Sequence, residues 1–230
     1  MTSKNIISVQ NLTKTYGKKV KTDVLKKVNL SIKEGTFNWI IGSSGSGKTT
    51  LLNLISGLDE ATSGQIYIDN VLITNMNEKD KATFRANHLG FIFQFHYLLP
   101  EFTALENVLM PLRIKNQKIT KEIKKQAIEL LSTVGLSHVY DHYPKELSGG
   151  EQQRTAIARA IIGNPKLVIA DEPTGNLDSI NANQVYDLIR KLHKDFKMTF
   201  IIVTHDTIKP IKGDRLITLK DGNIIKDEVY

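Results

Sequence analysis

A glycine-rich loop that carries a lysine is the part of this sequence most directly suited to chemistry. Residues 42–49 read Gly-Ser-Ser-Gly-Ser-Gly-Lys-Thr and match the phosphate-binding pattern G-x-x-x-x-G-K-[ST]. Such glycines let backbone N–H groups surround an anion at the positive end of a helix. The lysine then reaches the β- and γ-phosphates, and the threonine hydroxyl binds Mg²⁺. The predicted nucleotide-binding residues are Gly42, Ser43, Ser44, Gly45, Ser46, Gly47, Lys48, Thr49 and Thr50.

The segments on both sides of this loop predict the elements that must position it. The apolar run Phe37–Ile41 predicts a buried strand, and residues 50–56 predict a helix that ends before Gly57. A chance match to the pattern in a chain of this length has a probability on the order of 1%. Because strand, loop and helix occur in this order, an ordinary Gly/Ser loop with an incidental lysine is a poor alternative.

A second predicted strand ends in two acidic residues. Leu-Val-Ile-Ala at residues 167–170 is followed directly by Asp171 and Glu172. Ligands of open α/β sheets bind at the carboxyl ends of the strands, so both carboxylates are expected at a binding edge. Asp171 would hold Mg²⁺, directly or through water, and Glu172 would polarise an attacking water as general base. The alternative is a strand with an acidic turn, which the phosphate loop upstream disfavours.

Four further polar segments stand at expected strand ends and helix starts. Residues 147–154, Leu-Ser-Gly-Gly-Glu-Gln-Gln-Arg, open a helix that Ser148 can cap. The two glycines expose backbone N–H groups and predict a second anion site at a helix N-terminus. The other three segments are Gln94 after the apolar run 91–93, His205 after the strand 200–203, and the loop 175–178.

In this order the segments resemble the nucleotide-binding subunit of an ATP-binding cassette (ABC) transporter. The family order is phosphate loop, glutamine loop, signature, acidic strand, D-loop and histidine switch, and the resemblance covers essentially the whole chain. It implies an ATPase that uses ATP and Mg²⁺. The implied fold is an α/β P-loop NTPase core of ABC type with an N-terminal antiparallel β subdomain and a helical subdomain. One phosphate loop and one signature per chain imply a dimer of two copies that encloses ATP at two shared sites.

The resemblance also implies a role for individual residues. Tyr16 would stack on adenine, with an ordinary turn aromatic as the alternative, and Asp178 would cross the dimer interface. The implied catalytic residues are Lys48, Gln94, Glu172 and His205. The implied Mg²⁺ ligands are Thr49, Gln94 and Asp171. The implied signature contacts to ATP on the second copy are Ser148, Gly149, Gly150 and Glu151.

Residues 91–108, Phe-Ile-Phe-Gln-Phe-His-Tyr-Leu-Leu-Pro-Glu-Phe-Thr-Ala-Leu-Glu-Asn-Val, are similar to the ATPases of lipoprotein-releasing (Lol) transporters of Gram-negative bacteria. This finer resemblance implies a subunit that powers release of lipoproteins from the inner membrane toward the outer membrane. Two integral membrane subunits would dock between Gln94 and Pro111, unless these apolar residues only form the core of the helical subdomain. Alternative functions are those of a related macrolide or peptide exporter or a cell-division complex. A soluble ABC ATPase acting on nucleic acid or the ribosome is disfavoured, because the chain lacks a long coiled-coil insert and a second cassette.

Composition narrows the class of protein further. The formal net charge is +7 and there is no cysteine, which argues against a disulfide framework or thiolate chemistry. The longest apolar runs are far too short to span a bilayer. Lysines cluster at residues 18–27 and 115–125 without interleaved aromatics, a pattern that favours solvated faces or an anionic membrane surface over nucleic acid. The resemblance to lipoprotein-releasing ATPases then implies peripheral association with the cytoplasmic face of the bacterial inner membrane.

The remaining patterns predict a single domain over residues 1–230. Short apolar strands at 6–9, 28–32 and 65–68, with turns at Asn29 and 33–35, predict an antiparallel patch wrapped around the loop strand. The predicted helices are 120–135, with Thr120 as its cap, 150–162 and 181–193, and the predicted hairpin turn is Asp221-Gly222. The core with its β subdomain is expected at about 1–88 and 164–230, and the helical subdomain at about 89–163. His138 and His142 are expected to be surface residues rather than a metal pair, since no third ligand is evident nearby.

Overall fold

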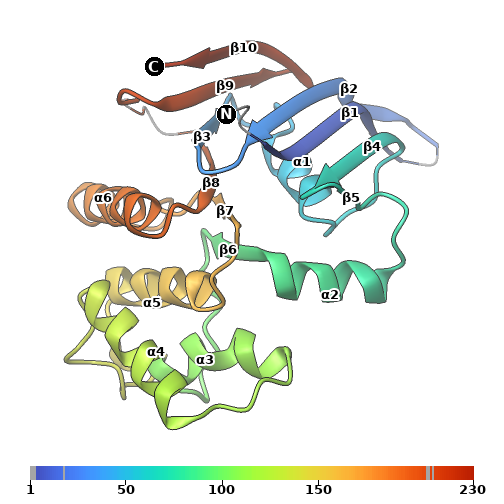
Figure 1. Cartoon of the computed structure of the whole chain (residues 1–230). Helices are drawn as coiled ribbons and strands as arrows, with labels where there is room; N and C mark the ends of the chain where they lie inside the picture. Colours follow the sequence, from blue (N-terminus) through green and yellow to red (C-terminus); the bar gives the residue numbers. More distant parts are fainter. Residues whose placement is uncertain (1–3, 18, 206–207, 209) are drawn as a thin grey trace. The chain divides into compact units, whose positions relative to one another are not determined.

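The chain forms two compact units in the computed structural model, which describes all residues except 1–3, 18, 206–207 and 209 (Figure 1). The first unit contains Met1–Arg85 and Met198–Tyr230, and the second contains Ala86–Lys197. The expected helical subdomain, about residues 89–163, falls within the second unit, and its existence as a separate subdomain stays a prediction. In the described part of the chain, no helix combines the length and the apolar composition that a membrane span requires.

An antiparallel sheet makes up much of the first unit (Figure 1). Its strands are β1 (Asn5–Tyr16), β2 (Thr22–Lys33), β4 (Ser63–Ile68) and β5 (Val71–Leu72), in the order β2-β1-β4-β5. Val9 pairs with Leu30 on one side and with Ile66 on the other. Val28, Leu30 and Ile32 alternate with exposed residues, as expected of a sheet with one buried face. The predicted strands are confirmed, although β1 and β2 extend well beyond their apolar centres.

Two expectations about this region are corrected by the structure. The loop strand β3 (Phe37–Ile41) belongs to a different set of strands, with which it pairs in parallel, and all its residues but Ile41 are buried. Asn29 is not a turn residue but lies inside β2, opposite a register shift of β1. Its Oδ1 accepts the Asn11 N–H (2.9 Å), and its Nδ2 donates to the Lys27 carbonyl (3.0 Å). The side chain thus replaces ladder hydrogen bonds that the irregularity removes.

The second set of strands in the first unit surrounds β3. This strand lies between β8 (Thr199–Thr204) and β9 (Asp214–Lys220), parallel to both, and β9 pairs antiparallel with β10 (Asn223–Val229). All residues of β8 are buried, which explains the apolar run Phe200–Val203 at its centre. The turn between β9 and β10 holds Asp221 and Gly222 at φ 47° and 78°. Two positive φ angles are what a two-residue hairpin turn needs, so this prediction is confirmed.

Two helices accompany these strands. Helix α1 (Lys48–Ile55) begins two residues earlier than predicted, because Gly47 at φ 101° turns the chain directly into the helix. Helix α2 (Glu78–His88) was not predicted, since its sequence is mostly polar and lacks a clear apolar period. The Asn77 side chain accepts the Asp80 N–H (2.9 Å) and so caps the start of α2.

The second unit is mainly helical. Its strands β6 (Leu89–Phe93) and β7 (Leu167–Asp171) run parallel, and its helices are α3 (Ala104–Ile114), α4 (Lys121–Thr133), the 3-10 helix η1 (Pro144–Glu146), α5 (Gly149–Ile161) and α6 (Ser179–Phe196). Helix α5 packs against β6 and against α3, α4 and α6. Helices α4, α5 and α6 confirm the prediction within a few residues. Helix α3 was missed, although Thr103 and Glu106 form a capping box at its start.

Candidate nucleotide site

The phosphate-binding pattern forms the turn between β3 and α1. A side chain at Gly42 would place its Cβ 2.2 Å from the Leu219 carbonyl oxygen, and one at Gly47 would lie 2.9 Å from the Leu25 side chain. Gly45 has φ 77°, and apart from Gly45 itself and its two chain neighbours no described residue has an atom within 4 Å of the position a Cβ would take there. The turn is therefore packed on its inner side, and only glycine fits at Gly42 and Gly47. At Gly45 it is open to a ligand.

Hydrogen bonds hold this loop in shape. The Gly222 N–H of the β9–β10 turn donates to the Ser46 carbonyl (3.1 Å). The Lys48 ammonium donates to the carbonyl oxygens of Gly42 (2.8 Å) and Ser43 (3.0 Å), and this lysine is only 7% exposed. The ammonium group is thus fixed beside the loop, where it would meet a phosphate.

The start of α1 supplies further polar groups. Gly47, the N-cap residue, provides no side chain to satisfy the first N–H groups of the helix, so these remain for a ligand. Thr49 is exposed and Thr50 is half-buried on the first turn. The Ser46 hydroxyl is buried, and no described residue gives it a hydrogen-bond partner. An ammonium group, hydroxyls and N–H groups together suit a polyphosphate.

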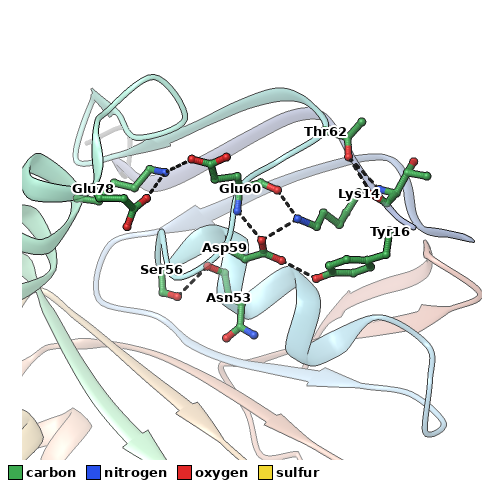
Figure 2. A network of polar contacts seen from close by, with 10 residues as sticks. Lys14, Tyr16, Asn53, Ser56, Asp59, Glu60, Thr62 and Glu78 are labelled. Carbon is green, nitrogen blue, oxygen red and sulfur yellow. Dashed lines mark hydrogen bonds and ion pairs between the residues drawn. The ribbon is translucent and has the colours of Figure 1, made fainter. Parts of the chain in front are cut away.

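Tyr16 ends β1 in the same unit and is 41% exposed. Its hydroxyl donates to Asp59 Oδ2 (2.5 Å), and the Lys14 ammonium lies 4.5 Å from the ring centroid (Figure 2). Burial and the Asp59 carboxylate raise the pKa of Tyr16 above its ordinary value, so the phenol stays protonated. The ring is thus fixed in place and partly accessible, which suits stacking on a base.

His205 follows β8 directly, as predicted, and is exposed. It lies in the first unit with the phosphate loop and Tyr16. The other predicted site residues, from Gln94 to Asp178, lie in the second unit. The catalytic roles assigned to both groups stay predictions.

Asp171 is the last residue of β7, and Glu172 follows it at φ 48°. A glutamate rarely adopts this left-handed conformation, and such backbone strain concentrates at functional sites. The Gly175 N–H donates to the Glu172 carbonyl (3.1 Å), which closes the turn after the strand. The structure therefore places both carboxylates at the carboxyl end of a strand, as the sequence predicted.

The loop after β7 contacts the residue that follows β6. The Asn176 side chain donates to the Gln94 carbonyl (3.0 Å), and the Gln94 side chain donates to Asn176 Oδ1 (3.4 Å). Asp178 caps α6 by accepting the N–H groups of Ile180 (3.0 Å) and Asn181 (3.1 Å). Gln94 and this loop are thus brought together, while Asp178 already has a structural role beside its predicted dimer contact.

The signature residues form the start of α5. Ser148 and Glu151 make a capping box in which the Ser148 N–H donates to Glu151 Oε2 (2.8 Å) and the Ser148 hydroxyl also reaches that oxygen (2.7 Å). The hydrogen bond from the Ser148 side chain lowers the pKa of Glu151. Glu151 also lies 3.3 Å from the ring of His138, which is exposed. Among the described residues, no cluster of three or more His, Cys, Asp or Glu side chains could hold a metal ion.

Two side chains of α5 that the sequence analysis missed connect these parts of the second unit. The Gln153 amide, fully buried, donates to the carbonyls of Phe93 (3.3 Å) and Pro173 (2.5 Å) at the ends of β6 and β7. Arg159 donates to the carbonyls of His96 and Tyr97 (both 2.6 Å), and burial lowers the pKa of Arg159 to about 10. No sequence pattern distinguishes these residues from solvent-facing polar ones.

Comparison with known proteins identifies this arrangement. The family model described as ABC transporter matches residues 25–175. The chain belongs to the ABC transporter family. This ABC protein is 48% identical over 221 residues to the lipoprotein-releasing system ATP-binding protein LolD of Francisella tularensis subsp. holarctica (strain OSU18), a match that covers 95% of each chain. It is 46% identical over 219 residues to the LolD protein of Psychrobacter arcticus, covering 95% of this chain and 97% of that one.

Solved structures agree with this family. The ATP-binding cassette MJ0796, in a dimeric post-hydrolysis state bound to ADP and Pi, superimposes on this ABC protein with a TM-score of 0.86 and 41% identity. The match covers 97% of this chain and 98% of that chain. The transporter component cbiO1 of Clostridium perfringens gives a TM-score of 0.85 and 30% identity over 97% of this chain and 88% of its own. The predicted fold class, an α/β ATPase of ABC type, is confirmed.

Proposed function

We propose that this ABC protein is the ATP-hydrolysing subunit of a complex that releases lipoproteins from the bacterial inner membrane. The observation that carries the proposal is the 48% identity to a LolD protein over 95% of both chains. At this level of similarity the resemblance extends beyond the motifs shared by all ABC proteins. The protein would associate peripherally with the cytoplasmic face of that membrane.

ATP would bind through the first unit. The N–H groups of the loop and the Lys48 ammonium would hold the phosphates, and the Tyr16 ring would stack on adenine. Thr49, Gln94 and Asp171 offer hydroxyl, amide and carboxylate oxygens, and such hard donors fit Mg²⁺. When bound, Mg²⁺ neutralises charge that develops on the transferring phosphate.

Hydrolysis would use a carboxylate and an imidazole of this chain. Glu172 would accept a proton from the water that attacks the γ-phosphate in line, and His205 would orient that water. In this proposal ATP binding depends on the phosphate loop, and proton transfer depends on the carboxylate that follows β7.

Two copies of the chain would enclose ATP between them. The dimeric structures of the cassette MJ0796 support this arrangement. Each copy would present the loop containing Lys48 to one nucleotide and the α5 start, Ser148 to Glu151, to the other. Asp178 would lie at the interface between the copies.

The membrane subunits would dock on an apolar patch that follows Gln94, consisting of Phe95, Tyr97 and Leu99. Phe95 is 60% exposed, Tyr97 64% and Leu99 39%. Neighbouring apolar residues exposed in this way mark interaction surfaces, and such a surface suits the apolar face of a short partner helix. Arg159 holds the backbone of this segment to α5, so the patch has a defined shape.

The test is to purify the subunit from its native membrane in mild detergent and identify the proteins that accompany it. Two related membrane proteins with large periplasmic domains, together with bound lipoprotein, would support the proposal. A single homodimeric exporter would indicate an exporter ATPase, and the absence of any membrane protein would overturn the transporter assignment. The double variant Phe95→Ser/Tyr97→Ser should lose the membrane partners, whereas Phe196→Ser, at another exposed aromatic, should keep them.

A further inference from the structure

A network of polar contacts joins the end of β1 to the segment that follows α1 (Figure 2). Asp59 is its centre, and the two oxygens of its carboxylate have different partners. Oδ1 accepts the Lys14 ammonium (2.7 Å) and the Glu60 N–H (2.7 Å), and Oδ2 accepts the Tyr16 hydroxyl (2.5 Å). Lys14 also donates to the Glu60 carbonyl (2.6 Å). Every partner of this carboxylate is therefore a donor.

The network is partly shielded from water. The Lys14 side chain is only 10% exposed and that of Asp59 28%. The Lys14 ammonium also lies over the Tyr16 ring, 4.5 Å from its centroid. Burial alone would raise the pKa of Asp59, but the hydrogen bonds from Lys14, Tyr16 and the Glu60 N–H lower it. The carboxylate thus stays ionised and accepts the phenol hydrogen at neutral pH.

Asp59 is attached to the helix that carries the phosphate loop. The N–H groups of Leu58 (2.8 Å) and Asp59 (3.2 Å) both donate to the Asn53 carbonyl in the last turn of α1. Helix α1 has eight residues, so its two ends are about 12 Å apart. Lys48 stands at one end, and Asp59 follows the other. The Tyr16 ring is therefore tied to the same rigid element as the loop.

We propose that Asp59, held by Lys14, is a positioning residue for the nucleotide base: its carboxylate fixes the Tyr16 ring relative to the phosphate loop. The inference rests on the proposed function, in which Tyr16 stacks on adenine. A ring at an exposed strand end would otherwise turn about two side-chain bonds, and binding would have to immobilise it. A side chain fixed before binding improves affinity by about 3- to 10-fold. Stacking needs one face of the ring, so the ammonium over the ring is compatible with it.

The experiment compares the Kd of ATP with that of tripolyphosphate, both as magnesium salts, on the full chain. Tripolyphosphate engages only the phosphate loop, so it reports on the loop and not on the ring. Tyr16→Phe keeps the ring and removes the hydroxyl, and we expect the Kd of ATP to rise about 3- to 10-fold while that of tripolyphosphate is unchanged. Asp59→Ala should match Tyr16→Phe, and it should have no further effect in a Tyr16→Ala background.

The chain offers a matched control in Tyr67 on β4, whose hydroxyl donates to Gln65 (3.2 Å). Tyr67→Phe removes the same group from a neighbouring strand and should leave both Kd values unchanged. Tyr16→Phe loses one hydroxyl only, so it remains informative if Asp59→Ala fails to fold in a thermal unfolding check.

Three outcomes would contradict the proposals, and they are distinguishable. A Tyr16→Phe variant with the wild-type Kd for ATP would overturn the positioning role and leave stacking intact. An equal rise in Kd for ATP and tripolyphosphate would show that the network supports the loop rather than the ring, which also overturns it. If Tyr16→Ala leaves the Kd of ATP unchanged, the stacking role in the proposed function is itself wrong.

Discussion

Two helix starts in this molecule resemble each other in sequence and differ in structure. Helix α1 starts at Gly47, which turns at φ 101° and offers no side chain to the first N–H groups. Helix α5 starts after Ser148, whose hydroxyl accepts the Glu151 N–H in a closed capping box. The first start is therefore prepared for an external anion, whereas the second already has a carboxylate of its own. The cap, and not the number of glycines, decides how many N–H groups of the first turn remain free for a ligand.

The largest expected effect comes from separating the proposed ATP-binding role of Lys48 from the proposed catalytic role of Glu172. Glu172→Gln should retain ATP binding and lower turnover by a factor of about 10²–10⁴, because the proposed general base is lost. Lys48→Ala should instead lose ATP binding. The measurements are the steady-state ATPase rate and the Kd of ATP. Glu129→Gln, the same change at an exposed position of α4, should alter neither value, and near-normal turnover by Glu172→Gln would remove Glu172 as the base.

The next effect distinguishes the glycines of the two helix starts. Gly47→Ala forces a side chain into the left-handed region and 2.9 Å from Leu25, so we expect a loss of about 1–3 kcal/mol in stability and a much weaker ATP complex. Gly149→Ala places its Cβ 3.7 Å from Leu177, an ordinary contact, and should leave stability equal or about 0.5–1 kcal/mol higher. Chemical unfolding and the Kd of ATP measure both. Equal destabilisation by the two changes would contradict the comparison.

A smaller effect is expected from opening the capping box of α5. Ser148→Ala should cost about 1 kcal/mol and lower the Tm by about 2–4 °C. Thr103→Ala opens the similar box at the start of α3 and serves as the control. We expect both variants to lose similar stability and only Ser148→Ala to lose ATPase activity. If Thr103→Ala is equally inactive, the loss reflects unit stability and not a contact of Ser148 with ATP.

The smallest effect is a pH dependence of the second unit. Burial lowers the pKa of His96 from its ordinary value of 6.5, and the charge of Arg159 lowers it further. The hydrogen bond with Gln152 raises this pKa but does not offset the other two effects. The unfolded chain then binds a proton at a higher pH than the folded one, so stability is complete above pH 6.5 and falls as the pH drops below it. Unfolding curves of the wild type and His96→Gln between pH 5 and 8 should show this slope only in the wild type. A variant with the same slope would assign it to other groups.

The sequence predicted the elements whose patterns are local. The sequence predicted the strands Phe37–Ile41 and Leu167–Ala170 because burial on both faces gives an apolar run. It predicted the hairpin turn Asp221-Gly222 because a two-residue turn favours these residue types. Helix α2 was not predicted because its sequence is mostly polar. Asn29 was predicted as a turn residue because asparagine is common in turns, whereas here its side chain accepts the Asn11 N–H beside an irregularity of β1.

The residues of the candidate site also fall into two groups: those in contiguous sequence motifs, which were predicted, and those defined by distant contacts, which were not. The loop residues and the acidic strand end are contiguous motifs, so their positions followed from the chain itself. Gln153 donates a hydrogen bond to Pro173, 20 residues away in the sequence. Lys14 donates one to Asp59, 45 residues away. Such pairs form only when the elements pack, and one sequence without relatives carries no record of them. The roles of the site residues in catalysis remain to be tested by the variants above.

The lysine of the phosphate loop has an electrostatic consequence for its own backbone. Because the Lys48 ammonium accepts no hydrogen bonds and donates to the carbonyls of Gly42 and Ser43, it neutralises the negative ends of two peptide dipoles. The electrostatic potential at the loop is then set by the partial positive charges of the N–H groups and by the positive charge of the ammonium. Replacing Lys48 by alanine would remove the cation and also expose two carbonyl dipoles to the arriving phosphate, so repulsion would add to lost attraction.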